Sequence, residues 1–383
     1  MSGWEHSSTK WNLPCAVRVP GGVNCKGNVH ESGSTESARF CFAVLTKGCD
    51  TPMNLSDCTL CPRECHVNRN AGQTGYCGQT SDIVVARAAL HMWEEPCISG
   101  TNGSGTVFFG GCNLHCIFCQ NYSISKNGNM NRKIGKIVSV SRLSEIYLEL
   151  QDKGAHNINL VTPTHYIPQI IESLELAKKN GLRIPIVYNT GCYEKVKTLR
   201  QLEGFVDIYL PDLKYFSPAI SSRYSNATDY FIYASAAIEE MFRQVGSPVF
   251  EVSLSNDDKS HKASDSENLD TSNNTALDIS ETALMKKGVI VRHLLLPDCA
   301  EDSRQILKYL YQTYGNNIYM SIMNQYTPMP QVAAIPSLNR KVTEQEYDAL
   351  IDYAISLGIE NAFIQEGYTA SESFIPAFTG EGI

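Results

Sequence analysis

Three cysteines within eight residues are the strongest chemical signal in this sequence. Cys112, Cys116 and Cys119 have the spacing C-x3-C-x2-C and directly follow the apolar run 106–110. Three thiolates on one short loop can bind three corners of a cubane [4Fe–4S] cluster and leave the fourth iron free for a substrate. Structural zinc normally takes four ligands, so three crowded cysteines would leave it one short. We therefore expect an iron–sulfur cluster at this loop, with three unrelated buried thiols as the simpler alternative.

The same loop resembles the radical S-adenosylmethionine (SAM) superfamily, because an aromatic residue precedes its last cysteine and a chain of βα units follows it. The resemblance implies that the methionine amino and carboxylate groups of SAM bind the free iron. It also implies that an electron from the cluster breaks the sulfonium bond and gives a 5′-deoxyadenosyl radical, which abstracts hydrogen. Phe118 matches the position that packs near the adenine in this superfamily. The protein then supplies orientation, electronics and exclusion of water.

A second cysteine group precedes the first strand. It has the spacing C-x2-C-x3-C-x11-C and consists of Cys58, Cys61, Cys65 and Cys77. Four soft ligands in this pattern can close a tetrahedral zinc site or hold a second iron–sulfur cluster. The spacing favours an auxiliary metal over free thiols but leaves zinc and iron–sulfur equally open.

Three further motifs narrow the resemblance. They are the run C-x2-C-P-R-x-C-x-V-N-R-x2-G-x2-G-x-C from Cys58, E-E-P-x-I-S-G at 94–100 and F-C-Q-N at 118–121. Together they are similar to a branch related to the activating enzymes of pyruvate formate-lyase, over a stretch from about Cys58 to the C-terminus that includes 374–378. This likeness implies a glycyl-radical activase, and radical modification of a small molecule is the alternative. We expect an electron donor such as a flavodoxin or ferredoxin.

One departure from the relatives lies after the second predicted strand. Many relatives carry Gly-Gly-Glu there to bind the methionine amino group, whereas this chain has Thr162-Pro163-Thr164-His165. Hydroxyl groups and strand-end carbonyls can accept from an ammonium group, so Thr162 and Thr164 are candidate cofactor contacts. They can equally be capping residues of the next helix. His165 is better explained as a core histidine.

Polar residues also follow the third, fourth and fifth predicted strands. Asn189 follows the third strand, Asp212 and Lys214 follow the fourth, and Arg292 and His293 interrupt the fifth. Charges in a strand built for burial are costly unless they are paired or face a site. Their positions resemble those that surround the methionine carboxylate and ribose in the activating enzymes. Arg292 can bind a carboxylate through two hydrogen bonds. The alternative is a structural ion pair between Asp212 and Arg292.

The elements that must position these residues form a βα repeat. Short apolar runs at 106–110, 157–161, 184–188, 206–210, 289–295 and 318–322 predict strands, with a possible last strand at 362–365. Amphipathic segments between them predict helices, for example at 141–153, 168–180, 302–313 and 343–357. Near-continuous apolar strands indicate a parallel sheet buried on both faces, with the site at the strands' carboxyl ends.

We therefore predict an α/β fold, a partial (β/α)6 barrel of the radical SAM type with a small N-terminal cysteine-rich module. Its expected parts are a poorly ordered segment 1–55, the cysteine-rich module 56–105 with a strand-like stretch at 83–90, and the barrel 106–383. Residues 253–280 are rich in Ser, Asn and Asp, which predicts a disordered insertion in the barrel.

The composition excludes several classes of protein. The 383 residues carry 32 Lys and Arg against 40 Asp and Glu, a net charge of −8, so nucleic acid is not an expected partner. No apolar run has the roughly 20 residues that cross a membrane, and no signal peptide begins the chain. The 14 cysteines then indicate metal ligation in a reducing cytoplasm rather than disulfides. The rival to a radical SAM enzyme is an electron-transfer or zinc-binding adaptor protein without SAM chemistry.

Overall fold

An open, mostly parallel β-sheet organises the chain. The computed structural model describes residues 53–125, 134–252, 283–365 and 378–383, all within a unit that spans Pro52–Ile383. The predicted insertion at 253–280, the segment 374–377 and the predicted N-terminal segment up to residue 52 lie outside these described residues.

Seven of the described strands run parallel, in the order β10-β9-β8-β6-β5-β4-β2. They are β2 Ser104–Phe109, β4 Ile158–Val161, β5 Ile186–Thr190, β6 Ile208–Pro211, β8 Ala283–Leu294, β9 Tyr319–Met323 and β10 Ala362–Ile364. Each contains or overlaps one of the strands expected from the apolar runs. The predicted α/β fold with a parallel sheet is therefore confirmed.

Three further strands pair antiparallel. β1 Ile83–His91 joins β2, β3 Lys136–Val138 joins β1, and β7 Val249–Val252 joins the start of β8. The strand-like stretch expected near residue 83 is β1, and it belongs to the same sheet as the parallel strands. β3 and β7 were not expected, and β8 begins six residues before the predicted strand because its first part pairs with β7.

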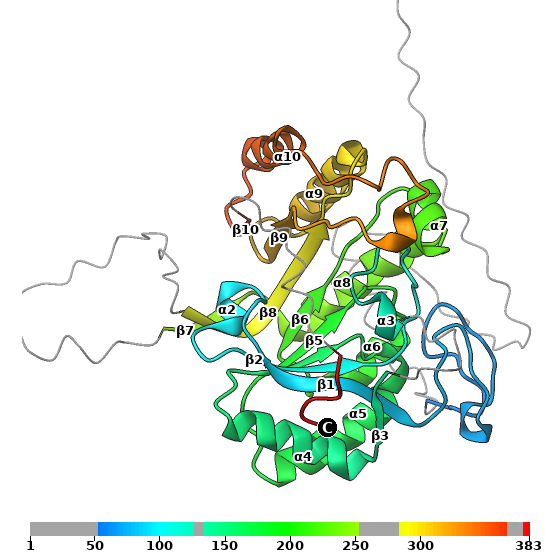
Figure 1. Cartoon of the computed structure of the whole chain (residues 1–383). Helices are drawn as coiled ribbons and strands as arrows, with labels where there is room; N and C mark the ends of the chain where they lie inside the picture. Colours follow the sequence, from blue (N-terminus) through cyan, green and yellow to red (C-terminus); the bar gives the residue numbers. More distant parts are fainter. Residues whose placement is uncertain (1–52, 126–133, 253–282, 366–377) are drawn as a thin grey trace, which may run out of the picture. The chain divides into compact units, whose positions relative to one another are not determined.

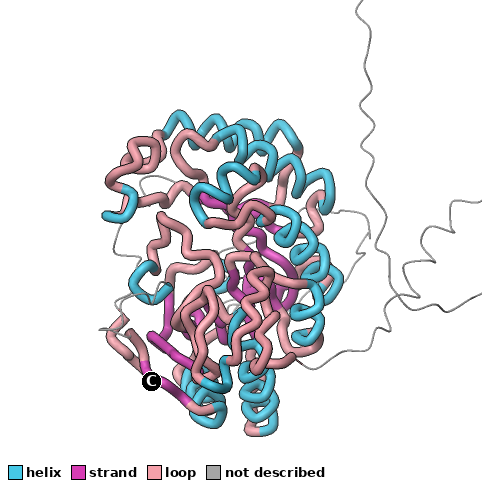
Figure 2. The backbone as a smooth tube through the Cα atoms, turned by 90° about the vertical axis from the view of Figure 1, so that its right-hand side faces the viewer, coloured by secondary structure: helices cyan, strands magenta, loops and turns pink. Residues whose placement is uncertain are grey.

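Helices occupy the connections between the parallel strands (Figure 1). The longer ones are α4 Val140–Asp152, α5 Ile167–Lys179, α7 Pro218–Ser225, α8 Tyr230–Val245, α9 Ala300–Tyr314 and α10 Glu344–Leu357. Short turns of helix are α2 Pro96–Ser99, α3 Tyr122–Ser125, α6 Val196–Leu199, η1 Arg69–Ala71, η2 Thr164–Tyr166, η3 Arg200–Leu202 and η5 Pro330–Val332. Figure 2 shows the cyan helices set around the magenta strands.

Local sequence explains where two of these helices begin. The Ser139 side chain accepts a hydrogen bond from the main-chain N–H of Arg142 and so caps α4. Thr343 and Glu346 form a capping box at the start of α10, in which each side chain bonds the other residue's main-chain N–H. Such caps satisfy main-chain donors that have no partner within the helix, and each stabilises the helix by about 1 kcal/mol.

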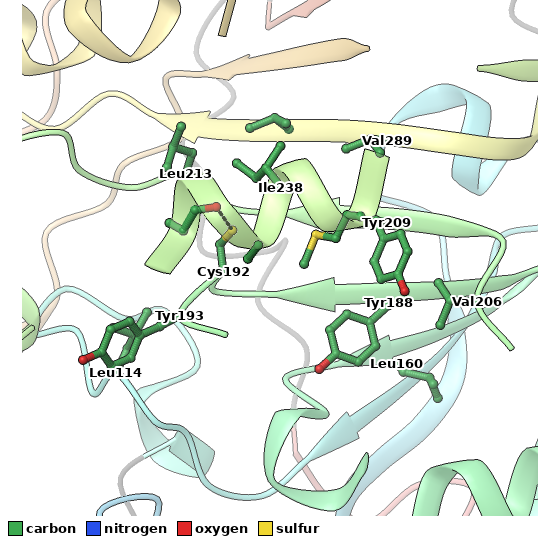
Figure 3. Packing of buried hydrophobic residues seen from close by; sticks show 14 of the residues in the cluster. Leu114, Leu160, Tyr188, Cys192, Tyr193, Val206, Tyr209, Leu213, Ile238 and Val289 are labelled. Carbon is green, nitrogen blue, oxygen red and sulfur yellow. Dashed lines mark hydrogen bonds between the residues drawn. The ribbon is translucent and has the colours of Figure 1, made fainter. Parts of the chain in front are cut away.

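The sheet has two buried faces with different partners. Strand register places Leu160, Tyr188, Tyr209 and Val289 in one row across four strands, where they pack against helices such as α8 through Ile238 (Figure 3). Because side chains alternate along a strand, the residues between them point to the other face. That face carries Val187, Ile208 and Ile290, which pack against Cys97 and Ile98 of α2, together with the polar residues described next.

Candidate active site

A cavity of about 240 Å³ lies where the parallel strands end. Its walls come from the residues that end or follow β2, β4, β5, β6, β8 and β9, as expected for a parallel α/β sheet. Residues singled out from the sequence that line it are Cys112, Cys116, Phe118, Cys119, Thr162, Asn189, Asp212, Lys214 and Arg292. Segments far apart in the sequence thus supply one shared lining.

The three-cysteine loop begins at the end of β2 and turns at a glycine. Gly111 has a φ of 87°, and a Cβ there would lie 2.6 Å from the carbonyl oxygen of Cys77. Two of the thiols have hydrogen-bond donors nearby: the Ser225 hydroxyl donates to Cys116 Sγ at 2.9 Å, and the Leu114 N–H donates to Cys112 Sγ at 3.4 Å. Donors aimed at sulfur favour the thiolate that a metal requires.

Burial opposes ionisation of these thiols. It raises the pKa of Cys112 to about 11 and that of Cys119 to about 12, while the positive charge of Lys214 acts in the opposite direction on both. A thiol in this setting becomes a thiolate when a metal replaces its proton. Three soft sulfur donors that face one cavity fit three corners of an iron–sulfur cluster. Within the described ranges, no three or more His, Cys, Asp or Glu side chains are arranged around a single metal-ion position.

Arg292 is the centre of a buried charged network beside the loop. Its guanidinium bonds Asp212 Oδ1 at 2.7 Å, Asn189 Oδ1 at 2.7 Å and Glu94 Oε2 at 3.1 Å. Lys214 Nζ donates to the other oxygen of Asp212 at 2.8 Å. The ion pair between Asp212 and Arg292, one of the two interpretations left open by the sequence, is therefore present.

The network sets the protonation of its carboxyl groups. Burial by itself would raise the pKa of Asp212, but Arg292 and Lys214 outweigh it and hold the pKa below its ordinary value. Glu94 differs, because its burial dominates over the attraction of Arg292 and raises its pKa. Asp212 therefore stays ionised at the wall of the cavity, with both cations beside it.

Two sequence-derived candidates have partners elsewhere in the fold. Thr164 donates its hydroxyl to Glu194 Oε1 at 2.6 Å, and both ring nitrogens of His293 are within 2.8 Å of the Leu213 carbonyl and the Ser303 hydroxyl. Burial lowers the pKa of His293 to about 4, so this ring is neutral. Neither Thr164 nor His293 occurs among the described residues that line the cavity. Their geometry is that of residues that hold the strand ends in place.

The remaining candidate residues are Phe118, Thr162 and His165. Phe118 lines the cavity and packs edge-on against the rings of Tyr215, Tyr224 and Tyr326. Thr162 lines it too, in a left-handed backbone conformation with a φ of 59°. His165 is buried, with Nε2 2.7 Å from the Gly110 carbonyl, as expected for a core histidine.

The four-cysteine segment folds onto the three-cysteine loop. Its backbone closes a turn through hydrogen bonds from Cys58 N–H to the Val67 carbonyl and from His66 N–H to the Cys58 carbonyl. The N–H of Tyr76 donates to Cys65 Sγ at 3.2 Å, and the buried Arg69 lies 4.0 Å from Cys58 Sγ. Cys58, Cys61 and Cys65 are partly buried, whereas Cys77 is buried.

Sequence reasoning missed Glu94 as a member of the site. It appeared only within the E-E-P motif, yet its side chain bonds Arg292 and accepts from Asn159 Nδ2 at 2.9 Å. β1 runs antiparallel to β2, so the loop after β1 enters from the opposite end of the parallel strands. A rule based on the carboxyl ends of parallel strands cannot find such a residue. Two adjacent acidic residues before a proline were the available signal.

Comparisons with known proteins find one family model, a sequence relative and solved structures similar to parts of this chain. Residues 106–250 match the model of the radical SAM superfamily. The uncharacterized protein MJ0674 of Methanocaldococcus jannaschii is 25% identical over 307 residues, which cover 78% of this chain and 75% of that protein.

Among solved structures, Streptococcus suis SuiB bound to S-adenosylmethionine is 15% identical with a TM-score of 0.40, over 68% of this chain and 52% of that one. SuiB bound to the precursor peptide SuiA is 13% identical with a TM-score of 0.38, over 67% and 46%. The chain thus spans about half the length of these structures. The matched residues 106–250 hold most of β2, the three-cysteine loop and the strands up to β6, so the likeness to the radical SAM superfamily covers the segment that carries the candidate site.

Proposed function

We propose that this chain is an enzyme that cleaves SAM reductively and uses the resulting radical to remove hydrogen from a substrate. The observation that carries the proposal is a loop of three cysteines, all of which face one cavity at the carboxyl ends of a parallel sheet. The loop lies inside the matched domain. Cys112, Cys116 and Cys119 would hold a [4Fe–4S] cluster, and SAM would occupy the cavity beside it.

Cys112, Cys116 and Cys119 would hold a cluster that would supply the electron for breaking the sulfonium bond of SAM. The protein's part is to hold and shield the reactants. Phe118 offers an aromatic edge, and Asn189 and Asp212 offer oxygen acceptors whose positions Arg292 fixes. Lys214 places a positive charge near Cys112 and Cys119, which favours their thiolate forms. These residues would orient a ligand in the cavity.

Anaerobic reconstitution with iron and sulfide, followed by an assay for 5′-deoxyadenosine, tests the proposal. The matched control replaces Cys112, Cys116 and Cys119 by alanine together. We expect 5′-deoxyadenosine from the wild type and none from the control. A fully loaded wild type that releases none, and whose cluster spectrum stays unchanged when SAM is added, would favour the electron-transfer or zinc-binding adaptor instead.

For the substrate, we propose a glycyl-radical enzyme, in line with the motif resemblance to activating enzymes. A small molecule is the competing substrate class. Incubation of the reduced protein with SAM and pyruvate formate-lyase, followed by electron paramagnetic resonance (EPR), should give a glycine-centred radical. SAM cleavage without any protein radical would favour the small molecule. A flavodoxin or ferredoxin would be the electron donor, tested by replacing the chemical reductant with each protein.

We also propose a second metal at Cys58, Cys61, Cys65 and Cys77. Four thiols on one folded segment, one of which accepts a main-chain N–H, support zinc or a second cluster. Metal and sulfide analysis of the variant that lacks Cys112, Cys116 and Cys119 distinguishes these metals. Zinc without sulfide indicates the first, and iron with sulfide indicates the second. Adding Cys58→Ala and Cys61→Ala should remove the signal, and no metal in the parent variant would refute the second site.

A further inference from the structure

The side chain of Arg63 connects the two cysteine groups. Arg63 lies between Cys61 and Cys65 in sequence, yet its guanidinium reaches the three-cysteine loop. Nε donates to the Asn113 carbonyl at 2.8 Å, Nη2 donates to the Ser225 carbonyl at 3.0 Å, and Nη1 donates to the Asn226 carbonyl. A guanidinium carries five N–H donors in a rigid plane, so one side chain can join three carbonyl groups from two distant segments.

Each of the two joined segments either contains the cysteines of the loop or bonds one of their thiols. Asn113 lies between Cys112 and Cys116, so its carbonyl belongs to the loop itself. Ser225 is the last residue of α7, and its hydroxyl donates to Cys116 Sγ at 2.9 Å. The last carbonyl groups of a helix lack partners within the helix and attract a cation. Arg63 thus supplies the missing donors at the end of α7 and fixes that end against the loop.

Tyr76 makes a second contact between the same two segments. Its ring lies 3.8 Å beneath the Arg63 guanidinium carbon and stacks on the His115 ring at 4.6 Å. Its hydroxyl donates to the Leu114 carbonyl at 3.4 Å, while its main-chain N–H donates to Cys65 Sγ. His115 has a φ of 55°, a conformation that costs free energy unless contacts of this kind stabilise it.

We infer that Arg63 is a positioning residue for the three-cysteine loop, and that the four-cysteine segment holds the cluster-binding thiols in place through it. The inference rests on the proposed function, since it gives the loop a cluster to bind. It goes beyond that function because it makes the geometry of one cysteine group depend on the fold of the other. Loss of Arg63 frees three carbonyl groups at once and lets the loop open.

Two variants of the full chain test this role. Arg63→Gln removes the charge and the fork of donors, whereas Arg63→Lys keeps only the charge. In metal-free protein, we expect Arg63→Gln to increase the rate at which iodoacetamide alkylates Cys112, Cys116 and Cys119 by about tenfold or more, measured for each cysteine by mass spectrometry. Arg63→Lys should restore little of the protection, because lysine cannot bond three carbonyl groups in one plane.

A spectroscopic measurement separates positioning from general destabilisation. In reconstituted, reduced protein, the part of the EPR signal that changes when SAM is added should be weaker or shifted in Arg63→Gln. Arg142→Gln is the matched control, because Arg142 on α4 also bonds two partners, Glu145 and Glu149, but contacts neither cysteine group. It should keep both the wild-type alkylation rates and the wild-type signal.

The outcomes distinguish this inference from the proposed function. Wild-type alkylation rates and an unchanged EPR signal in Arg63→Gln would overturn the inference and leave the function intact. Equal effects in Arg142→Gln would overturn it as well. If wild-type protein gives no signal that responds to SAM, the proposed function fails, but alkylation of the metal-free chain still decides whether Arg63 holds the loop. Should Arg63→Gln not fold, Tyr76→Phe, which loses only one hydrogen bond to the loop, must show the same change at smaller size.

Discussion

Thr162 shows how a single residue at the cavity carries backbone strain. It directly follows β4 and has a φ of 59°, although its side chain is β-branched. A left-handed conformation costs an L-residue about 1–2 kcal/mol, and a branched Cβ makes it rarer still. Strain of this kind persists where the surroundings hold the residue in place, and here the Thr162 N–H is fixed by a 2.8 Å bond to the Asn189 carbonyl.

Thr162→Gly should therefore stabilise the fold. Glycine adopts this conformation freely, and the gain exceeds its larger entropy loss on folding, so we expect the free energy of unfolding to rise by about 0.5–1 kcal/mol. Urea unfolding of the metal-free protein measures the change. Thr164→Gly serves as the control and should be destabilising, because Thr164 has no such strain and loses its bond to Glu194. A less stable Thr162→Gly variant would show that the threonine hydroxyl or methyl group offsets the strain.

Glu194 gives a pH dependence whose sign follows from its burial. Its carboxyl group accepts hydroxyl bonds from Thr164, Thr190 and Tyr188, and burial raises its pKa from 4.5 to about 7. The folded protein therefore binds this proton more tightly than the unfolded chain does. The contribution to stability is complete below pH 4.5 and is lost as the pH rises through about 7.

We expect wild-type protein to lose up to about 3 kcal/mol of stability over this pH range relative to Glu194→Gln, at 1.36 kcal/mol per pKa unit. The glutamine keeps the shape and one acceptor oxygen but has no proton to lose. Unfolding free energies of both proteins, measured with urea at several pH values, give the difference. Parallel curves for the two proteins would mean that Glu194 has an ordinary pKa.

At the scale of the elements, the Arg292 network joins β5, β6 and β8 to the loop after β1. Removing the central cation leaves the buried Glu94 without its cationic partner and leaves Asp212 with Lys214 alone. Loss of one member of a buried pair typically costs about 3–5 kcal/mol. We expect Arg292→Met to destabilise the fold by that amount in thermal or urea unfolding.

Two comparisons show whether the buried charge causes this loss. Arg142→Met removes an arginine from a more exposed network with Glu145 and Glu149 and should cost under about 1 kcal/mol. Adding Glu94→Gln to Arg292→Met should recover part of the stability, because one uncompensated carboxyl group is gone. A double variant that loses the sum of the two single effects would contradict the coupling.

Sequence patterns predicted the parallel strands well because those strands are buried on both faces. Runs such as 206–210 and 318–322 are apolar except for one polar residue each, Asp207 and Ser321, and each lies within one or two residues of a strand. β7 was missed for a physical reason. It pairs antiparallel with Ala283–Lys287 across a long polar segment, so its four residues have no neighbouring pattern to mark them. β3 is only three residues long, and two of them are exposed.

At the scale of the whole molecule, the site could be predicted only where its residues are contiguous. The three-cysteine loop needs no tertiary information, because spacing alone brings its thiols together. Asn189, Asp212 and Arg292 could be placed by a topological rule for strand ends. The partners of Thr164 and His293 depend on side-chain packing, which sequence spacing does not encode. Glu94 and Arg63 reach their partners across 198 and 50 or more residues, beyond any local pattern.

The last described residues, 378–383, pack against β1 and β2 beside the cavity. Phe378 packs edge-on against Phe108 of β2, whose ring lines the cavity, with centroids 5.4 Å apart. Three residues later, the Glu381 carbonyl accepts from the Ala88 N–H at 2.9 Å, and its side chain pairs with Arg87. The last residues thus bond β1 beyond the part of it that pairs with β3, and Phe378 packs against a residue that lines the cavity.

Phe378→Ala should therefore affect both stability and ligand binding. Phe378 is partly exposed, so we expect a loss of about 1–2 kcal/mol in unfolding free energy, below the value for a fully buried phenylalanine. Phe108 would lose its ring partner, and SAM should bind more weakly to the reconstituted protein, as measured by titration calorimetry. Ile355→Ala on α10 is the control. This side chain is exposed, and it is not among the described residues that line the cavity. If Phe378→Ala binds SAM like the wild type while losing stability, the last residues serve only to cover β1, since the cavity wall would then keep its shape without them.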